Sequence, residues 1–208
     1  MARSDEVDTL VEVEAAAGEM FRDVGLDAIA DDDEPAAEDL LTAIAAQTIW
    51  VAEVGGRVVG YAWTLDLGRP GRPLPHLEQL SVRPEHGGRG IGTVLVEEAM
   101  RWARRQGGTD LTLTTFRDVW FNRPWYERRG FEVLSDDHLI RDEARLNVGG
   151  AARRESHHET RRRKQRRNLR RDRRRSGTAD FRGDRRITRH LDGRPEHRRR
   201  RRNPHSAR

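Results

Sequence analysis

A glycine-rich turn between a strand-like segment and a helix-like segment constrains this chain most. Residues 77–82 are short and mostly apolar, as in a strand, and Pro84 cannot continue a strand's hydrogen-bond ladder. Four of the six residues 87–92 are glycine, so the backbone there can bend tightly and approach a ligand closely. From Ile91 onward, apolar residues recur at helical spacing as far as Trp102. The segment therefore predicts a strand, a tight turn and an amphipathic helix in immediate succession.

This succession predicts a site for a phosphate or diphosphate group. The first turn of a helix leaves backbone N–H groups unpaired and carries a partial positive charge. Glycines expose these amides to an anion, and Arg89 adds a formal charge. The alternative is a turn that only lets the helix pack on a sheet. Two familiar phosphate loops do not fit. A P-loop needs lysine where Thr93 follows Gly92, and a dinucleotide fingerprint needs a small residue where the chain has Leu95.

The order of the predicted elements indicates a mixed α/β sheet. Two glycines at positions 55 and 56 predict a hairpin turn. Strand patterns cover residues 48–54, 57–65, 77–82, 110–115 and 131–134. Helical patterns cover residues 10–24, 35–46 and 122–129, besides the helix that begins at Ile91. Helices alternate with strands only in the second half of this order, which favours a sheet with both parallel and antiparallel pairs.

Composition excludes several classes of protein and of site. The 208 residues include no cysteine, so disulfides, thiolate zinc sites and a cysteine nucleophile are all impossible. The histidines, His76 and His86 among them, show no metal-ligand spacing. No window is apolar enough to span a bilayer, and the N-terminus is too acidic for a signal peptide. We therefore expect a cytoplasmic protein with no metal and no membrane contact.

The charge divides the chain into two parts. Residues 1–137 contain 14 basic and 26 acidic side chains, a net charge of −12. Residues 138–208, the basic tail, contain 26 basic and 9 acidic side chains, a net charge of +17. All five tryptophans lie in the first part, and the basic tail has too few apolar residues to bury a core. This predicts one folded domain over residues 1–137 and a disordered or irregular, arginine-rich tail.

Two motifs in the first part resemble those of the GCN5-related N-acetyltransferase (GNAT) family. The family's acetyl-CoA-binding motif, Gln/Arg-x-x-Gly-x-Gly/Ala, falls on residues 87–92, with the departure that Gly87 replaces Gln or Arg. The family's segment Asn-x-x-x-Tyr-x-x-x-Gly-Phe falls on Asn122, Tyr126 and the Gly-Phe pair at 130 and 131. The resemblance covers about residues 8–137 and implies the acyl-CoA N-acyltransferase fold.

Two strands of that fold are not recognisable in the sequence. The family usually has a strand before the first helix, but residues 1–8 are short and polar. It also has a strand that returns to the sheet after the segment at Phe131, and nothing beyond Leu139 resembles one. We therefore expect the domain to lack its first and last strands, which would leave an unpaired sheet edge.

The resemblance implies an activity and a site. The chain would transfer an acetyl group from acetyl-CoA, as cosubstrate, to a primary amine. Tyr126 would protonate the departing thiolate, and Glu78 is the candidate base, unless it is a solvent-facing or ion-paired strand carboxylate. Strands 77–82 and 110–115 would splay, with pantetheine between them. The cofactor-binding residues would be Leu80, Ser81, Val82, Gly87, Gly88, Arg89, Gly90, Ile91, Gly92, Thr93 and Asn122.

The basic tail supports two interpretations. Its arginines could neutralise the phosphates of a nucleic acid, although aromatic residues for base stacking are nearly absent. The near-exclusive use of Arg over Lys is also what a GC-rich gene gives when read out of frame, and we favour this frameshift hypothesis. Two alternative functions therefore stand beside the acetyltransferase: a nucleic-acid-binding protein, and a degenerate acetyltransferase fold without activity. The sequence specifies neither the acceptor nor the choice between monomer and homodimer.

Overall fold

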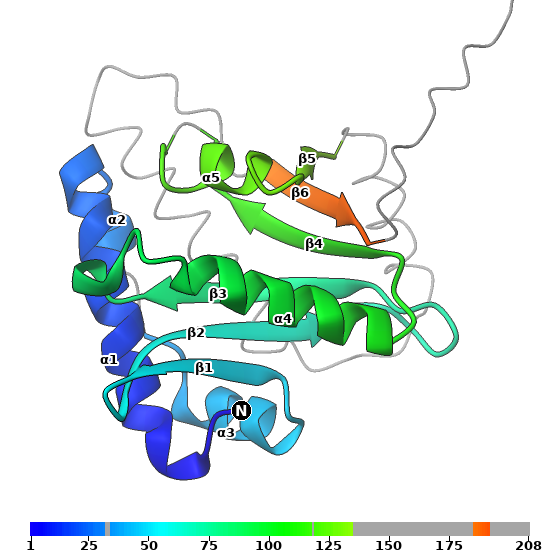
Figure 1. The fold of residues 1–208 in the computed structure, drawn as a ribbon, viewed down its shortest axis with the longest axis horizontal. Helices are drawn as coiled ribbons and strands as arrows, with labels where there is room; N and C mark the ends of the chain where they lie inside the picture. The colour runs from blue at the N-terminus through cyan, green and yellow to red at the C-terminus, as the bar shows by residue number, and fades with distance from the viewer. Residues whose placement is uncertain (32–33, 118, 135–184, 192–208) are drawn as a thin grey trace, which may run out of the picture.

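The computed structural model describes residues 1–31, 34–117, 119–134 and 185–191 (Figure 1). The helices are α1 (Val7–Gly18), α2 (Asp27–Ala30), α3 (Ala37–Ala45), α4 (Ile91–Arg105) and α5 (Arg123–Glu127), and the 3-10 turns are η1 (Ser4–Glu6), η2 (Glu19–Val24) and η3 (Pro84–His86). The strands are β1 (Ile49–Val54), β2 (Arg57–Asp66), β3 (Pro75–Val82), β4 (Asp110–Thr115), β5 (Glu132–Val133) and β6 (Arg185–His190). They form one six-stranded mixed sheet, so the predicted α/β class is confirmed.

Most predicted elements lie where the patterns place them. The strand predicted over residues 110–115 has those bounds, and both hairpin glycines, Gly55 and Gly56, have positive φ angles. The N-terminal helix begins three residues earlier than predicted, at Val7, and its last part is the 3-10 turn η2. Helix α2 was not predicted, because four residues are too few to show a periodic pattern.

The last strand of the sheet corrects one expectation. The strand order is β1-β2-β3-β4-β6-β5, and β6 pairs antiparallel with both β4 and β5. The expectation that nothing beyond Leu139 returns to the sheet was therefore wrong. The sequence Arg-Arg-Ile-Thr-Arg-His hides the strand, because it contains a single strongly apolar residue. Residues 138–184 and 192–208 of the basic tail lie outside the described residues, so their predicted disorder stays a prediction.

At the other end of the chain, residues 1–3 form no strand. The backbone N–H of Ala2 donates a hydrogen bond of 3.0 Å to the carbonyl oxygen of Ile49, at the start of the edge strand β1. The turn η1 follows directly, so this single bond is the contact that ties the N-terminal backbone to β1.

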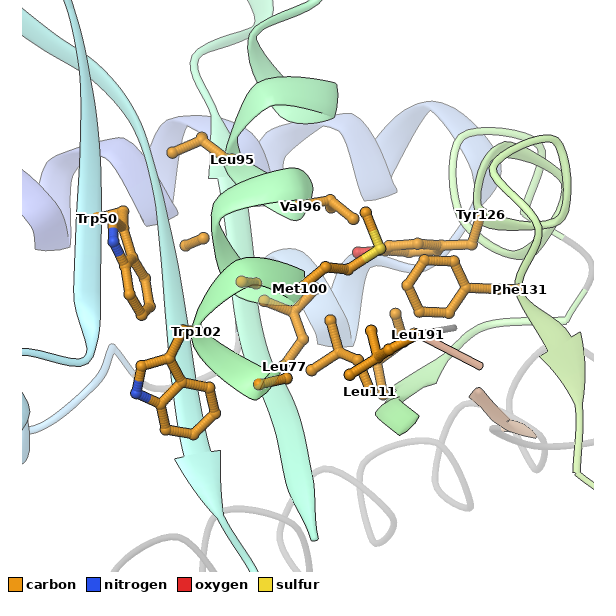
Figure 2. Close-up of a cluster of buried hydrophobic side chains, with 14 residues drawn as sticks. Trp50, Leu77, Leu95, Val96, Met100, Trp102, Leu111, Tyr126, Phe131 and Leu191 are labelled. Carbon is orange, nitrogen blue, oxygen red and sulfur yellow. The ribbon is translucent and has the colours of Figure 1, made fainter. Parts of the chain in front are cut away.

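Two hydrophobic cores cover the two faces of the sheet. Helix α4 lies across one face, and α1 and α3 lie against the other (Figure 1). Figure 2 shows the α4 side, where Leu95 and Trp102 pack with strand and loop residues. On the opposite side, Leu10 of α1 and Leu40 of α3 pack against β2. The apolar spacing noted from Ile91 to Trp102 is therefore observed as the buried face of α4.

Leu191, immediately after β6, fastens that strand to the domain. Its side chain is buried in the α4-side core beside Leu111 and Phe131 (Figure 2). The Leu191 backbone N–H donates to the carbonyl oxygen of Thr109 at 2.8 Å. The Arg104 guanidinium donates to the carbonyl oxygen of Leu191, also at 2.8 Å. A segment of arginine-rich sequence is thus held by one apolar side chain and by backbone hydrogen bonds.

The sheet splits between its two central parallel strands. β3 and β4 pair only at His76 with Thr112 and at Leu77 with Leu113. Beyond these residues the strands diverge toward their carboxyl ends, and the start of α4 lies at the same end (Figure 1). The predicted splay is observed, and it brings the glycine-rich turn, β3 and α5 to one end of the sheet.

Candidate functional site

The glycine loop, residues 87–92, follows η3 and ends in the first turn of α4. Residues 87–90 are exposed, and Ile91 and Gly92 are half-buried. Gly88 and Gly90 have φ angles of +71° and +83°, and a Cβ atom at either position would meet nothing within 4 Å. These two positions need glycine for their backbone conformation and leave open space above the backbone. Gly87 differs, because a Cβ atom there would lie 3.0 Å from the carbonyl oxygen of Pro84. The Gln or Arg of the family motif would therefore be tightly packed at this position.

Six consecutive backbone amides at this loop have no hydrogen-bond acceptor in the described parts of the chain. They belong to residues 88–93. Val94 is the first residue whose N–H is bonded, to the carbonyl oxygen of Gly90 at 3.1 Å. The amides lie at the positive end of the α4 dipole, in an exposed loop that includes Arg89. This arrangement is suited to binding an anion.

Arg129 places a second cation beside the same helix end. Its guanidinium donates to the Thr93 hydroxyl at 2.8 and 3.1 Å and to the Trp125 carbonyl oxygen at 2.9 Å, and it stacks 3.5 Å from the centroid of the Trp125 ring. Burial, followed by the charge of Arg128, lowers the pKa of Arg129. No described carboxylate pairs with it. A half-buried cation at the positive end of a helix is unfavourable unless an anion joins it.

Asn122 and Tyr126 lie one helical turn apart, as their spacing predicts. The Asn122 carbonyl oxygen accepts a hydrogen bond from the Tyr126 N–H at 3.1 Å. The Asn122 side-chain Nδ2 is buried and has no hydrogen-bond partner among the described residues. A buried amide donor left open in this way is a place where a ligand oxygen would fit.

Tyr126 is buried among aromatic and aliphatic side chains. Its ring lies edge-on to Phe131 at 5.4 Å and to Trp125 at 4.9 Å, near Met100 (Figure 2). Burial raises the pKa of the Tyr126 phenol above its ordinary value, and the charge of Arg129 only partly opposes this. No described residue forms a hydrogen bond to the phenol. It therefore holds its proton at neutral pH and is available as a proton donor.

The backbone of β3 faces the split in alternate residues. The Arg83 N–H donates to the carbonyl oxygen of Val59 in β2 at 2.8 Å. This bond shows which residues of β3 direct their backbone groups toward β2. By alternation, Ser81 directs its amide and carbonyl toward β2, whereas Leu80 and Val82 direct theirs toward the diverging β4. The sequence prediction did not separate these three residues. Leu80 and Val82 are the two able to pair with an extended ligand through their main chain.

Glu78 lies in a β-bulge rather than in the regular ladder. Gln79 pairs with Trp63 and Leu77 pairs with Thr64, so Glu78 is the extra residue of β3. Its side chain is only 9% exposed, and its Oε2 lies 3.7 Å from Nε2 of His76. The solvent-facing alternative considered for Glu78 is therefore wrong. His76 was not assigned any role from the sequence. Residues two apart on a strand share a face, and the structure adds that both side chains are shielded and 3.7 Å apart.

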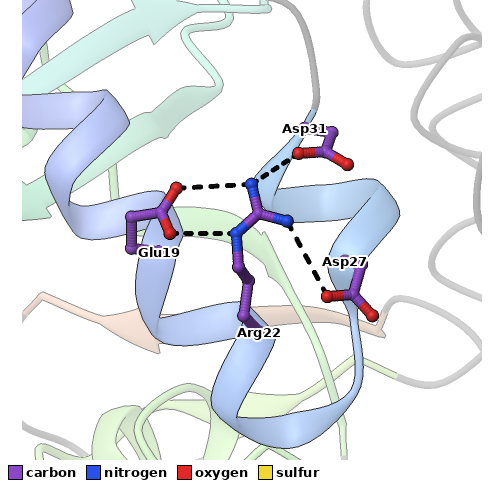
Figure 3. Close-up of polar contacts among 4 residues, drawn as sticks. All are labelled: Glu19, Arg22, Asp27 and Asp31. Atoms are coloured by element: carbon purple, nitrogen blue, oxygen red, sulfur yellow. Dashed lines mark hydrogen bonds and ion pairs between the residues drawn. The ribbon is translucent and has the colours of Figure 1, made fainter.

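The N-terminal helices cover the remaining side of the split. Phe21 of η2 stacks edge-on with Phe116 and Phe121, at 5.2 and 5.3 Å, which joins the helices to the segment between β4 and α5. Figure 3 shows Arg22 at the centre of a polar cluster. Its guanidinium forms ion pairs with Glu19, Asp27 and Asp31. Hydrogen bonds to Asp31 and Glu19 raise the pKa of Arg22 still further.

The acidic residues on this side are partly neutralised. Glu12 pairs with Arg83 at 3.1 Å, and Glu14 accepts a hydrogen bond from the Tyr61 hydroxyl. Asp31 is held by Arg22, and Asp32 and Asp33 lie outside the described residues. In the described parts of the chain, no three His, Asp or Glu side chains gather as metal ligands would. Every described helix is too short or too polar to form a membrane span.

Comparisons with known proteins agree with this geometry. The chain matches the Acetyltransferase (GNAT) family over residues 15–131. Rat N-acetyltransferase family 8 member 2 is 39% identical over 87 residues, which are 41% of this chain and 38% of that protein. Rat N-acetyltransferase 8 is 44% identical over 68 residues, which are 32% of this chain and 31% of that protein. The matches thus span less than two fifths of either relative.

Solved structures share the fold at low sequence identity. PaiA N-acetyltransferase from Thermoplasma acidophilum, in complex with coenzyme A, has a TM-score of 0.55 at 15% identity and covers 91% of this chain and 95% of its own. Naa20 from Chaetomium thermophilum, in complex with a bisubstrate analogue, has a TM-score of 0.52 at 17% identity and covers 64% and 69%. The structural likeness confirms the predicted fold, and the match over residues 15–131 shows that the chain belongs to the acetyltransferase (GNAT) family.

Proposed function

We propose that this chain is an acetyl-CoA-dependent N-acetyltransferase that acts on a primary amine. The observation that carries the proposal is the row of six amides at the start of α4, which have no hydrogen-bond acceptor among the described residues and lie beside the split in the sheet. The rat relatives are N-acetyltransferases by name, and the structural neighbour from Thermoplasma acidophilum binds coenzyme A. Both support the same activity for this chain.

The described residues fit coenzyme A in three places. The amides of residues 88–93, with Arg89 and Arg129, would hold the diphosphate. Leu80 and Val82 would pair with the pantetheine amides in the manner of an added strand. The buried Nδ2 of Asn122 would donate to an oxygen of the same ligand. Arg129 was not among the cofactor-binding residues predicted from the sequence. It would supply a positive charge near the loop, where Gly87 replaces the Gln or Arg of the family motif.

The chemistry needs one base and one acid from the protein. Acetyl-CoA would supply the acetyl group from its thioester, whose C–S bond would break, and coenzyme A would leave as the free thiol. Glu78 would accept one proton from the amine nitrogen as that nitrogen forms its bond to the acetyl carbon. Tyr126 would hold a proton for the departing sulfur, because burial keeps its phenol neutral, and would regain one from solvent. A backbone N–H of β3 would polarise the acetyl carbonyl.

Two glycines at opposite ends of α4 provide a matched test of the binding site. Gly90 and Gly107 have φ angles of +83° and +76°, and a Cβ atom would meet nothing within 4 Å at either. Gly90→Ala and Gly107→Ala should each cost about 1 kcal/mol of stability through backbone strain. Only Gly90→Ala should weaken acetyl-CoA binding in calorimetry. Equal affinities for the two variants would refute binding at this loop.

A thiol-release assay tests the activity directly. The chain has no cysteine, so every free thiol detected after reaction comes from coenzyme A. Full-length protein incubated with acetyl-CoA and a panel of primary amines should release thiol with at least one amine. Binding of acetyl-CoA without release for any amine would favour the degenerate, inactive fold, and absence of binding would remove the proposal altogether.

A further inference from the structure

His76 and Glu78 lie together at the point where the sheet begins to split. His76 belongs to the first of the two β3–β4 pairs, opposite Thr112. Side chains two residues apart on a strand lie on the same face, and Oε2 of Glu78 lies 3.7 Å from Nε2 of His76. Both side chains are shielded, with 2% of His76 and 9% of Glu78 exposed. The pair therefore lies inside the domain and not on its surface.

Hydrogen bonds on the far side of the His76 ring favour one tautomer. The Thr112 hydroxyl lies 2.9 Å from Nδ1 of His76 and donates its hydrogen to the carbonyl oxygen of Pro75 at 3.1 Å. A hydroxyl has one hydrogen, so the Thr112 oxygen must accept from His76 Nδ1–H. In the neutral ring, Nε2 then carries a lone pair and faces Glu78. The distance from this nitrogen to Oε2 of Glu78 is 3.7 Å.

We propose that His76 is the positioning residue for Glu78 and shares the proton that Glu78 removes from the amine. This proposal rests on the acetyltransferase function proposed above. The amine nitrogen gives one proton to Glu78 while its lone pair forms the bond to the acetyl carbon. The proton then lies between Glu78 and Nε2 of His76, which gives an imidazolium beside a carboxylate. Water takes the proton after the product leaves, and the pair returns to its starting state.

A purely structural histidine would behave differently in a double-mutant cycle. His76→Asn keeps a donor near the Nδ1 position for Thr112 and removes the nitrogen that faces Glu78. His76→Asn and Glu78→Gln should each lower kcat by about 10- to 100-fold, with little change in the KM for acetyl-CoA. The double variant should be no slower than the slower single variant, because both changes disable one unit. Multiplying effects, or an unchanged kcat in His76→Asn, would overturn the proposal.

Nitrogen-15 NMR of the full-length chain gives a readout that needs no turnover. The ring signals of His76 are those missing from the His76→Asn spectrum. We expect Nδ1 to be protonated and Nε2 unprotonated in the resting protein, and the Nε2 shift to change in Glu78→Gln. Thr112→Val removes the acceptor for Nδ1–H and should abolish the tautomer preference. A resting ring protonated at Nε2 instead would contradict the assignment.

A failure of the proposed acetyltransferase function can be distinguished from a failure of the role proposed for His76. If the wild-type protein releases no thiol with any amine, the proposed function fails, whatever the NMR result. If the wild type is active but the double-mutant cycle is multiplicative, only the role of His76 fails.

Discussion

Tyr126 shows how burial sets a residue's chemistry. Its phenol lies in a hydrophobic core, so the ionised form is disfavoured and the pKa rises. A general acid must keep its proton until the leaving group needs it, and this environment provides that condition. The resemblance of the Asn122–Phe131 segment to the family motif implies this role, but only the packing explains why the proton is retained.

Replacing Tyr126 with phenylalanine should separate catalysis from binding. Tyr126→Phe keeps the ring and its packing and removes the proton donor. We expect kcat to fall by about 100-fold while the Kd for acetyl-CoA stays within about twofold, because the hydroxyl acts on the departing sulfur. Initial rates at saturating acetyl-CoA, with calorimetry on the same preparation, measure both quantities. An unchanged kcat would remove Tyr126 from the mechanism.

The raised pKa of Tyr126 also predicts a pH dependence of stability. In the unfolded chain the phenol ionises near pH 10, whereas in the folded chain it stays protonated to a higher pH. Above about pH 10 the unfolded state therefore binds fewer protons, and the free energy of unfolding falls as pH rises. Tyr126→Phe should show a shallower fall between pH 9 and pH 11 in urea titrations. Parallel curves for the two proteins would contradict the burial of this phenol.

Replacing Arg129 tests whether this side chain contributes to the proposed anion site. Arg129→Gln should raise the Kd for acetyl-CoA about tenfold, since a charge-assisted contact is lost. Arg128→Gln is the matched control, because Arg128 is the exposed neighbour on the same helix end. Equal losses in both variants would indicate a diffuse charge effect and not a contact with the ligand.

Sequence reasoning reached some site residues and missed others for a physical reason. Gly90, Asn122 and Tyr126 belong to local motifs whose spacing carries the information. Arg129 contacts Thr93 on another helix, and the burial of His76 and Glu78 depends on the elements that pack around β3. No periodicity in a single segment reveals such contacts.

At the scale of elements, β6 was the main surprise. Strand recognition depends on alternating apolar residues, and the strand Arg185–His190 offers almost none. Its place is set by two flanking strands that each lack a partner on one side, and by the buried Leu191. The bulge in β3 was equally hidden, because register belongs to a pair of strands and not to one sequence.

Leu191→Ala should report how strongly β6 is held. Its side chain is 5% exposed, so truncation should cost about 2–4 kcal/mol of unfolding free energy. Leu41→Ala is the control, because Leu41 is 45% exposed and its loss should cost less than about 0.5 kcal/mol. Denaturant titrations of the two variants give the difference. A cost for Leu191→Ala no larger than that for Leu41→Ala would mean that β6 contributes little to the domain.

For the whole molecule, ligand binding should couple to stability. Acetyl-CoA that binds only the folded chain should add about 2.7 kcal/mol at a concentration of 100 times its Kd. This should appear as a rise in Tm that continues with the logarithm of ligand concentration. The Gly90→Ala variant should show a smaller rise than Gly107→Ala at equal ligand. A Tm independent of acetyl-CoA would contradict specific binding to the native state.

The division of the chain into an acidic domain and a basic tail also belongs to this scale. The frameshift hypothesis and the nucleic-acid hypothesis both stay predictions for the basic tail. Residues 185–191 contribute a strand, a buried leucine and several backbone hydrogen bonds to the domain. We therefore expect removal of residues 145–208 to destabilise the domain as well as to remove the charge, so a truncated protein is a poor control for nucleic-acid binding.

The insertion of β6 between β4 and β5 has a consequence for synthesis. While residues 185–191 are still inside the ribosome, β4 has an open edge and the two-residue β5 has no neighbour to pair with. Helix α5, which carries Tyr126, is followed in the chain by β5, so a nascent chain stalled before residue 185 should lack the β5–β6 pairing that follows this helix. A chain released before β6 is synthesised should therefore have no acetyltransferase activity.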